Sequence, residues 1–216
     1  AVANITVGND AGDAITTGQS NSLMGVNAGG SMTTGSYNVN IGEGAGVHIS
    51  TGDNNICIGH DSGRGNSPSG SITTGSNNVV LGNNSTNALY CADTSISSSD
   101  SRDKADVTDF TKGLDWIKAL RPVTYKWDKR SWYGTDAEPY GTPDGSKKKS
   151  KVNVGFLAQE VLAVEKANGY GDSKDNMLIC NLTEDEMRYG LKYERLVPVL
   201  VNAIKELSAR LDAAGL

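Results

Sequence analysis

A repeat that returns every 17 residues fills the first half of the chain and limits its fold more than any other feature. Each unit opens on an Asn and reaches a Gly four residues later, with apolar residues between them. The units begin at Asn4, Asn21, Asn38, Asn55 and Asn78. The last interval is 23 residues, which indicates an insertion around residues 64–70. A fixed period of this length is typical of architectures in which each unit stacks on the next.

A second marker keeps step with the first. It reads Thr-Thr-Gly or Ser-Thr-Gly and ends at Gly18, Gly35, Gly52 and Gly75. Alternating β-branched residues bounded by Gly and Asn predict two short strands in each unit. One unit offers only about three apolar side chains, so apolar burial must come from stacking units. We predict a β-helical shaft; a single-chain solenoid and three interlaced chains both fit, and we prefer the interlaced triple β-helix.

Composition changes sharply after the repeat. Residues 1–84 hold 17 of the 26 glycines, five acidic residues and one basic residue. Residues 99–216 hold 19 basic and 19 acidic residues and all three tryptophans. We therefore predict a shaft over 1–84, a linker over 85–98 and a mixed α/β domain over 99–216 that ends in a long helix.

Periodicity predicts the elements of the second half. Helical spacing runs from Phe110 to Leu120 and stops before Pro122. Thr183 with Glu186 has the form of a capping box that opens a short helix. The remaining expected elements are strands over 123–127, 152–156 and 189–193, a polar loop over 134–151, and helices from 157 and over 194–211.

The last helix carries an apolar stripe whose members are spaced by four, three and four residues. This is the spacing of a coiled-coil seam, and it is equally compatible with core packing inside the domain. The stripe consists of Leu200, Ile204, Leu207 and Leu211.

Charge and hydropathy exclude several classes of function. A net charge of −5 gives no basic character for nucleic-acid binding. No apolar run approaches 18 residues, so we expect no membrane insertion. The chain enters its repeat directly at Ala1 with no signal peptide, so we expect it to be the C-terminal piece of a longer protein.

Cysteine and histidine usage gives no sign of a cofactor or metal. Cys57, Cys91 and Cys180 are odd in number and widely spaced, which fits assembly in a reducing cytoplasm. His48 and His60 lie in the repeat without neighbours at ligand spacing. We predict no cofactor and no metal site.

The change of composition coincides with a Ser-rich segment that ends in Lys104. Ser99 precedes this lysine by five residues. A serine hydroxyl is a poor nucleophile unless a base takes its proton, and a lysine can do so when desolvation or a nearby cation lowers its pKa. On composition alone, the segment is also compatible with a flexible polar linker.

Four motifs in order carry a resemblance to a known family. They lie at 99–104, 120–127, 154–161 and 191–207. Together they resemble the C-terminal intramolecular chaperone domain of phage tail fibres and tailspikes, the peptidase S74 family of endosialidase tailspikes. The repeat is similar in kind to the triple β-helical shafts that precede such domains. The resemblance implies a homotrimer whose C-terminal domain guides folding of the shaft and then releases itself by cleavage.

The resemblance also assigns the site. It implies cleavage between Ser98 and Ser99, with Ser99 as the reactive residue and Lys104 as its basic partner. Ser97 and Ser101 lie close enough for the cut to fall one or two residues away. Attack by Ser99 Oγ on its own preceding carbonyl, or on another subunit, is allowed by the sequence.

Three further residues are candidates for supporting roles. Arg102 is the cation closest to Lys104 in sequence. Asp100 either orients the Ser99 amide or pairs with Arg102. Glu160, in the third motif, is an additional acid or base.

These features predict the end of a virion tail fibre or tailspike that assembles in the host cytoplasm. Its mature shaft could contact a host cell-surface receptor. One alternative is a non-cleaving trimeric adhesin whose C-terminal domain is a permanent cap. Another is a membrane-tethered regulator, which the lack of a membrane segment or DNA-binding region in this sequence disfavours.

Overall fold

The computed structural model describes residues 3–90, 99–135 and 137–215, and these group into two compact units. The first unit contains the described residues of 1–87, which we call the shaft. It also contains 126–152 and 182–188, which we call the cap segments. The second, which we call the helical unit, contains the described residues of 88–125, 153–181 and 189–216. Two segments of the C-terminal half therefore fold with the shaft.

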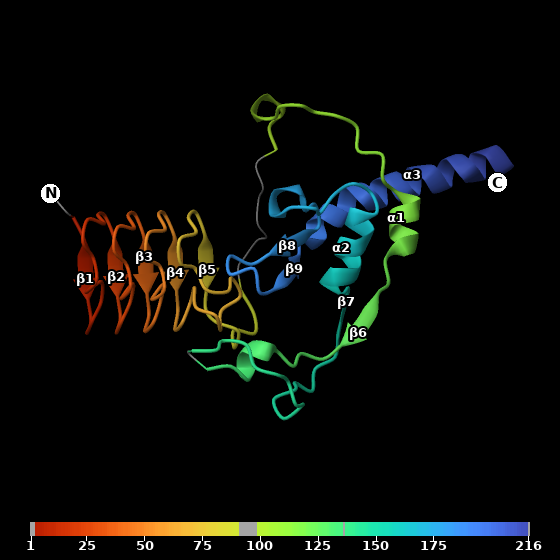
Figure 1. Cartoon of the computed structure of the whole chain (residues 1–216). Coiled ribbons are helices and arrows are strands. Elements are labelled where there is room, and N and C mark those ends of the chain that lie inside the picture. The colour runs from red at the N-terminus through yellow and green to blue at the C-terminus, as the bar shows by residue number, and fades with distance from the viewer. Residues whose placement is uncertain (1–2, 91–98, 136, 216) are drawn as a thin grey trace. The chain divides into compact units, whose positions relative to one another are not determined.

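The shaft is a β-solenoid whose coils follow the sequence repeat (Figure 1). One short strand per coil pairs in parallel with the next, and the register equals the repeat spacing. The middle residues of the second to fifth strands, Leu23, Asn40, Cys57 and Val80, are buried. The strands are β1 (Ile5–Val7), β2 (Ser22–Met24), β3 (Val39–Ile41), β4 (Ile56–Ile58) and β5 (Val79–Leu81).

The coils pair within one chain, so the solenoid alternative holds and the preferred interlaced arrangement does not. The amide of Ile5 donates to Asn21 O at 2.8 Å, and that of Ser22 donates to Asn38 O at 2.8 Å. These backbone groups are the ones that a neighbouring chain would need for interlacing. Their own chain already supplies the partners.

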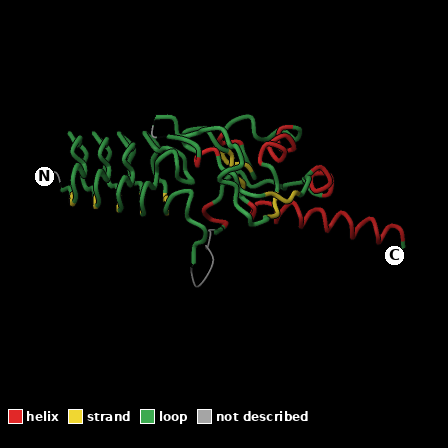
Figure 2. The backbone as a smooth tube through the Cα atoms, turned by 90° about the horizontal axis from the view of Figure 1, so that it is seen from below, coloured by secondary structure: helices red, strands yellow, loops and turns green. Residues whose placement is uncertain are grey.

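The Thr-Thr-Gly segment is not the second strand that the sequence predicted. Outside their short strands, the coils are loops and turns (Figure 2). The amides of Thr16, Thr17 and Gly18 all donate to the single carbonyl of Thr33, at 2.9, 3.2 and 3.2 Å. Three donors that converge on one acceptor cannot alternate as a strand ladder does. The segment still bonds to the next coil, but as a bend.

A ladder of buried asparagines runs along the shaft. Asn21 Oδ1 accepts from both the backbone amide and Nδ2 of Asn38, at 2.9 and 3.1 Å. Asn38 Nδ2 also donates to Gly52 O at 2.9 Å. Asn55 repeats these bonds one coil on, with the same distances to Asn38. The ladder fixes each coil on its neighbour, which explains the Asn that begins every unit.

The apolar core of the shaft lies beside this ladder, and glycines at two positions per coil let the coils approach. A Cβ at Gly35 would lie 2.6 Å from Gly52 O, so only glycine fits there. The buried apolar residues are Leu23, Ala28, Met32, Ala45, Ile49, Cys57, Ile72 and Val80.

The cap segment 126–152 has little regular structure beyond η2 (Arg130–Trp132). It is held together by cations stacked on aromatic rings, contacts that stabilise a fold without a strand ladder. Lys129 Nζ lies 5.0 Å from the Trp127 ring centre and 5.6 Å from that of Trp132. Lys149 Nζ lies 5.0 Å from Trp132.

The helical unit contains the remaining elements, most of them near their predicted places. β6 and β7 pair antiparallel. The elements are η1 (Ser101–Asp103), α1 (Leu114–Ala119), β6 (Val123–Tyr125), β7 (Asn153–Gly155), α2 (Ala158–Lys166), η3 (Lys174–Asn176), β9 (Tyr189–Leu191), η4 (Tyr193–Arg195) and α3 (Leu196–Ala214), together with β8 (Cys180–Leu182), whose last residue belongs to a cap segment.

One sequence prediction is wrong in this region: Thr183 and Glu186 do not open a helix. The amide of Thr183 donates to Arg188 O at 2.9 Å, which closes a turn between β8 and β9. Backbone pairing of the two strands therefore overrides the local helix signal.

Helix α3 packs on α1 and on the residues before it through its middle part. Glu206 accepts from the amide of Leu114, 3.3 Å from each carboxylate oxygen, and so satisfies the first amide of α1. The rings of Phe110 and Tyr170 lie 5.7 and 6.2 Å from that of Trp116. These aromatic contacts join α1 to the chain that follows α2.

The apolar stripe of α3 is not used for core packing. Its four members, Leu200, Ile204, Leu207 and Leu211, are 44–66 % exposed. The buried side of α3 is formed instead by Leu196, Val199 and Ala203. Among the described helices, none has the length and apolarity needed to span a membrane.

Candidate functional site

Ser99 and Lys104 meet at the start of the helical unit. Lys104 Nζ donates to Ser99 Oγ at 2.7 Å. The 3₁₀ turn η1 brings them together, because the amide of Asp103 donates to Asp100 O at 3.2 Å. Both side chains are exposed. The turn thus places a candidate nucleophile against a candidate base five residues away.

Asp100 and Arg102 form an ion pair inside the same turn. Asp100 Oδ1 accepts from the Arg102 amide at 2.9 Å, and Asp100 Oδ2 accepts from an Arg102 terminal nitrogen at 2.6 Å. These bonds lower the pKa of Asp100 and raise the pKa of Arg102. Two roles were predicted for Asp100: orienting the Ser99 amide or pairing with Arg102. In the structure Asp100 pairs with Arg102. The positive charge of Arg102 is therefore directed at Asp100.

Glu160 lies on α2 and is bound to Arg121, whose Nε donates to it at 3.1 Å. No hydrogen bond in the described parts of the chain joins Glu160 to Ser99 or Lys104. Ser98 lies outside the described residues. The catalytic roles of these residues stay predictions from the sequence.

The Ser99–Lys104 pair has the contact needed for acyl transfer, but it is not shielded from water. A lysine acts as a base only in its neutral form, which desolvation favours. In the single chain both side chains face solvent. The arrangement can therefore support serine activation once another surface excludes water from it.

A second cluster, absent from the sequence predictions, attaches a cap segment to the shaft. Its centre is Asp185. Oδ2 of Asp185 accepts from the Ser71 amide at 3.1 Å and from the Tyr140 hydroxyl at 2.6 Å. Oδ1 accepts from Thr183 Oγ1 at 2.6 Å and from the Met187 amide at 3.1 Å. One carboxylate thus joins both cap segments to the fourth coil.

Ionisation of Asp185 is set by these bonds. Burial alone would raise the pKa of Asp185, but the hydrogen bonds from Thr183, Tyr140, Met187 and Ser71 outweigh burial and lower it. Burial together with the bond to Asp185 raises the pKa of Tyr140 to about 12. At neutral pH a charged acceptor therefore faces a neutral phenol, which is the strong form of this bond.

Arg188 and Lys129 bind the end of the shaft from two sides. The guanidinium of Arg188 donates to Ser67 O and, at 3.4 Å, to Asn84 Oδ1. Lys129 Nζ donates to Asn84 O at 3.3 Å, and Asn84 Nδ2 donates to Ser131 Oγ at 2.8 Å. The partners on the shaft belong to the fourth-coil insertion and to the fifth coil.

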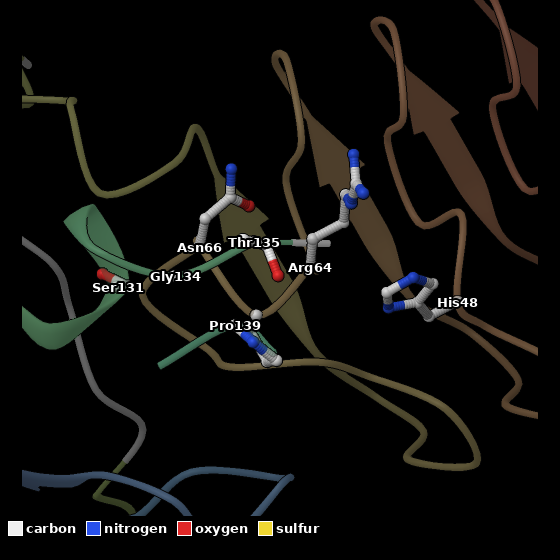
Figure 3. A pocket seen from close by; sticks show the side chains of 8 residues that line it. His48, Arg64, Asn66, Ser131, Gly134, Thr135 and Pro139 are labelled. Carbon is white, nitrogen blue, oxygen red and sulfur yellow. The ribbon is translucent and has the colours of Figure 1, made fainter. Parts of the chain in front are cut away.

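A small cavity of about 120 Å³ lies where the insertion meets segment 131–139 (Figure 3). Its two basic side chains already bind shaft residues. His48 Nδ1 lies 2.7 Å from Ser71 Oγ, and Arg64 donates to Asp61 at 2.6 Å. The cavity is lined by His48, Arg64, Gly65, Asn66, Ser131, Gly134, Thr135 and Pro139.

The described cysteines are unsuited to nucleophilic chemistry. Burial raises the pKa of Cys57 to about 11. Burial, followed by the nearby charge of Glu165, raises the pKa of Cys180 to about 12. Cys91 lies outside the described residues. In the described ranges, no three His, Cys, Asp or Glu side chains gather closely enough to hold a metal ion.

Sequence reasoning missed the cap cluster and one structural carboxylate. The acidic run at 184–186 was the available signal, but it was interpreted as a helix cap. Glu165 is fully buried and accepts from the amides of Leu178, Ile179 and Cys180, at 3.1, 2.7 and 2.8 Å. Nothing local marks a Glu in the last turn of α2 as the partner of three amides at 178–180.

The fold and these sites define a class: a β-solenoid whose last coils are capped by segments of its own C-terminal half, with a Ser–Lys pair in the helical unit. The family model described as chaperone of endosialidase (Peptidase S74) matches residues 99–170. The match confirms the resemblance drawn from the motifs, and the C-terminal region is similar to the chaperone domain of that family. No curated protein and no solved structure matches the chain.

Proposed function

We propose that the chain is the C-terminal part of a phage-type tail fibre or tailspike whose chaperone domain cuts itself off after the shaft has folded. The observation that carries this proposal is the 2.7 Å contact between Lys104 Nζ and Ser99 Oγ at the first residue of the family match. A pure linker has no reason to hold these two side chains together.

The cleavage step follows from ordinary acyl-transfer chemistry. Neutral Lys104 takes the Oγ proton of Ser99 as the oxygen bonds to the carbonyl carbon of Ser98. The C–N bond to Ser99 breaks, its nitrogen leaves as an amine with the proton, and an ester joins Ser98 to Ser99 Oγ. Water then hydrolyses the ester to a Ser98 carboxylate and the free Ser99 hydroxyl. Attack on a neighbouring subunit uses the same bonds in trans.

Assembly into a homotrimer would exclude water from the Ser99–Lys104 pair. Two exposed apolar faces support association with further copies of the chain, since large unpartnered apolar patches mark interaction surfaces. One is the stripe on α3. The other is the outward side of the shaft sheet, where Val7, Met24, Ile41, Ile58 and Leu81 are 39–53 % exposed. Their rung-by-rung spacing suits a second identical shaft packed alongside.

Intact-mass spectrometry of the parent beside Ser99→Ala and Lys104→Ala tests the cleavage. We expect the parent alone to yield a fragment that begins at Ser99. Ser173→Ala and Lys118→Ala change exposed residues outside the site and are matched controls that should cleave like the parent. If all five chains remain whole after days, self-cleavage is wrong.

Light scattering tests the trimer. Ile204→Glu places a charge in the α3 stripe and should lower the measured mass from three chains to one. Lys205→Glu changes an exposed neighbour on the same helix and should leave the trimer intact. A parent that is monomeric at micromolar concentration contradicts this part of the proposal.

On this proposal the shaft belongs to the virion and could contact a host cell-surface receptor, while the released domain stays in the host cytoplasm. Antibodies against residues 3–87 should stain purified particles, and antibodies against 99–215 should not. Staining by both would favour the second candidate, a non-cleaving adhesin with a permanent cap. That candidate draws support from the bonds that tie the cap segments to the shaft.

A further inference from the structure

We propose that the turn 183–188 takes the place of a further shaft coil, with the carboxylates of Glu184 and Asp185 standing where the carbonyl oxygens of the next repeat would stand. This inference rests on the proposed chaperone function and names the surface by which the domain recognises its folding substrate.

The first observation concerns the column of glycines. A Cβ at Gly18, Gly35 or Gly52 would meet the carbonyl oxygen of the glycine one coil ahead. Gly75 is the last member of this column among the described residues. A Cβ at Gly75 would instead meet Glu184 Oε2 at 2.9 Å. The side-chain oxygen of Glu184 thus fills the position of the missing carbonyl.

The second observation concerns a backbone amide at another point of the coil. The amide of Ser31 donates to Val47 O, in the next coil, at 3.0 Å. Ser71 occupies the position of Ser31 two coils further along the shaft, and no described shaft backbone carbonyl accepts from its amide. Its amide donates to Asp185 Oδ2 at 3.1 Å. The same amide thus finds the same kind of acceptor at nearly the same distance.

The third observation concerns the approach of the turn. A Cβ at Gly70 would lie 2.5 Å from Asp185 Oδ2, so a glycine is required for the carboxylate to reach the coil. The amide of Glu184 donates to Ser69 O at 3.3 Å. The turn therefore exchanges bonds in both directions with the fourth coil, as a neighbouring coil does.

The ligand of this surface is accordingly the open end of a solenoid coil: backbone amides and a glycine, not particular side chains. An open end exposes unpaired amides that can pair with other chains. The mimic satisfies them and fixes where the stack of coils ends.

Hydrogen exchange in the full chain, blocked by Ser99→Ala so that the cap stays attached, tests the inference. Asp185→Ala should lower protection of the Ser71 amide about tenfold, the equivalent of one hydrogen bond to a charged group. The Ser31 amide is the internal reference and should not change. Asp185→Asn keeps an oxygen acceptor and should lose less. Glu138→Ala removes an exposed carboxylate from a cap segment and should have no effect.

The glycine column gives an independent arm. Gly75→Ala should weaken the cap, and shortening the opposing side chain with Glu184→Ala should restore much of the loss. Gly52→Ala faces a backbone carbonyl, so Glu184→Ala should not rescue it. An unchanged Ser71 amide in Asp185→Ala, or equal losses at Ser71 and Ser31, overturns the inference. If the parent chain never cleaves, self-release is wrong, but the comparison of the Ser71 and Ser31 amides still tests this inference.

Discussion

The shaft and the helical unit are stabilised in different ways. In the shaft, each coil repeats the contacts of its neighbour, so the bonds of Asn38 to Asn21 recur between Asn55 and Asn38 at the same distances. In the helical unit, single residues make contacts that occur once, as Glu165 does with three successive amides. Repetition spreads stability over equivalent bonds, whereas the helical unit depends on a few side chains.

The largest expected effect follows from that dependence. Glu165→Ala leaves three amides without their acceptor, two of them buried, and should lower the free energy of unfolding of the helical unit by about 3–5 kcal/mol. Glu165→Gln keeps one acceptor oxygen and should lose about half as much. Denaturant unfolding with hydrogen exchange at residues 178–180 measures both. A loss of unfolding free energy below about 1 kcal/mol in Glu165→Ala would show that the helical unit does not depend on single side chains more than the shaft does.

A shaft asparagine should matter less, and equally in each coil. Asn38→Ala removes the partner of the Asn55 amide and of Gly52 O, at a cost of about 2–3 kcal/mol by denaturant unfolding. Asn21→Ala should cost the same within about 0.5 kcal/mol, since its contacts are equivalent. Glu43→Ala is the exposed control. Clearly unequal costs at the two asparagines would show that the coils are not energetically equivalent.

One position breaks the regularity of the shaft and should be improvable. Asn40 is fully buried between Leu23 and Cys57, and neither polar atom of its side chain has a hydrogen-bond partner. Asn40→Leu should raise the unfolding free energy by about 1–2 kcal/mol, because an unsatisfied buried amide is replaced by the residue of the preceding coil. Leu23→Asn should do the reverse. A destabilised Asn40→Leu would mean that the core at this position does not accommodate the Leu side chain.

The smallest effect concerns acid and the cap. Because the folded pKa of Asp185 is lowered, its contribution is present above the unfolded value of about 3.9 and is lost as pH falls through the folded pKa. Protection factors of the Ser71 amide should therefore fall below about pH 4 relative to those of Ser31. In Asp185→Asn this difference should not depend on pH. The same acid response in both chains would assign it to another group.

Sequence reasoning succeeded where structure follows local periodicity. The repeat gave the register of β1 to β5 directly, since one coil is one repeat. It could not choose between intrachain and interlaced pairing, because both present the same inward residues. The prediction of a second strand in each coil was wrong, because alternation alone does not reveal that Thr16, Thr17 and Gly18 share one acceptor.

The two candidate sites also differ in whether their residues are close together in the sequence. Ser99 and Lys104 are five residues apart, so a single turn brings them together and the sequence could pair them. Asp185 and Ser71 are 114 residues apart. Their contact depends on how the chain returns to the shaft, which no local pattern records, and the acidic run was therefore assigned to a helix.

The cap has a consequence for how long such a shaft can be. The hydrogen bonds described above between the cap segments and the shaft all end on shaft residues 67–84. Duplicating residues 21–37 in frame should therefore lengthen the shaft by one rung of about 4.8 Å and leave the Ser71 contact intact, which small-angle scattering and hydrogen exchange can measure. The length of the shaft and the structure of its capped end are therefore encoded by different parts of the sequence. Recombination between repeats can change the length and leave the capped end unaltered.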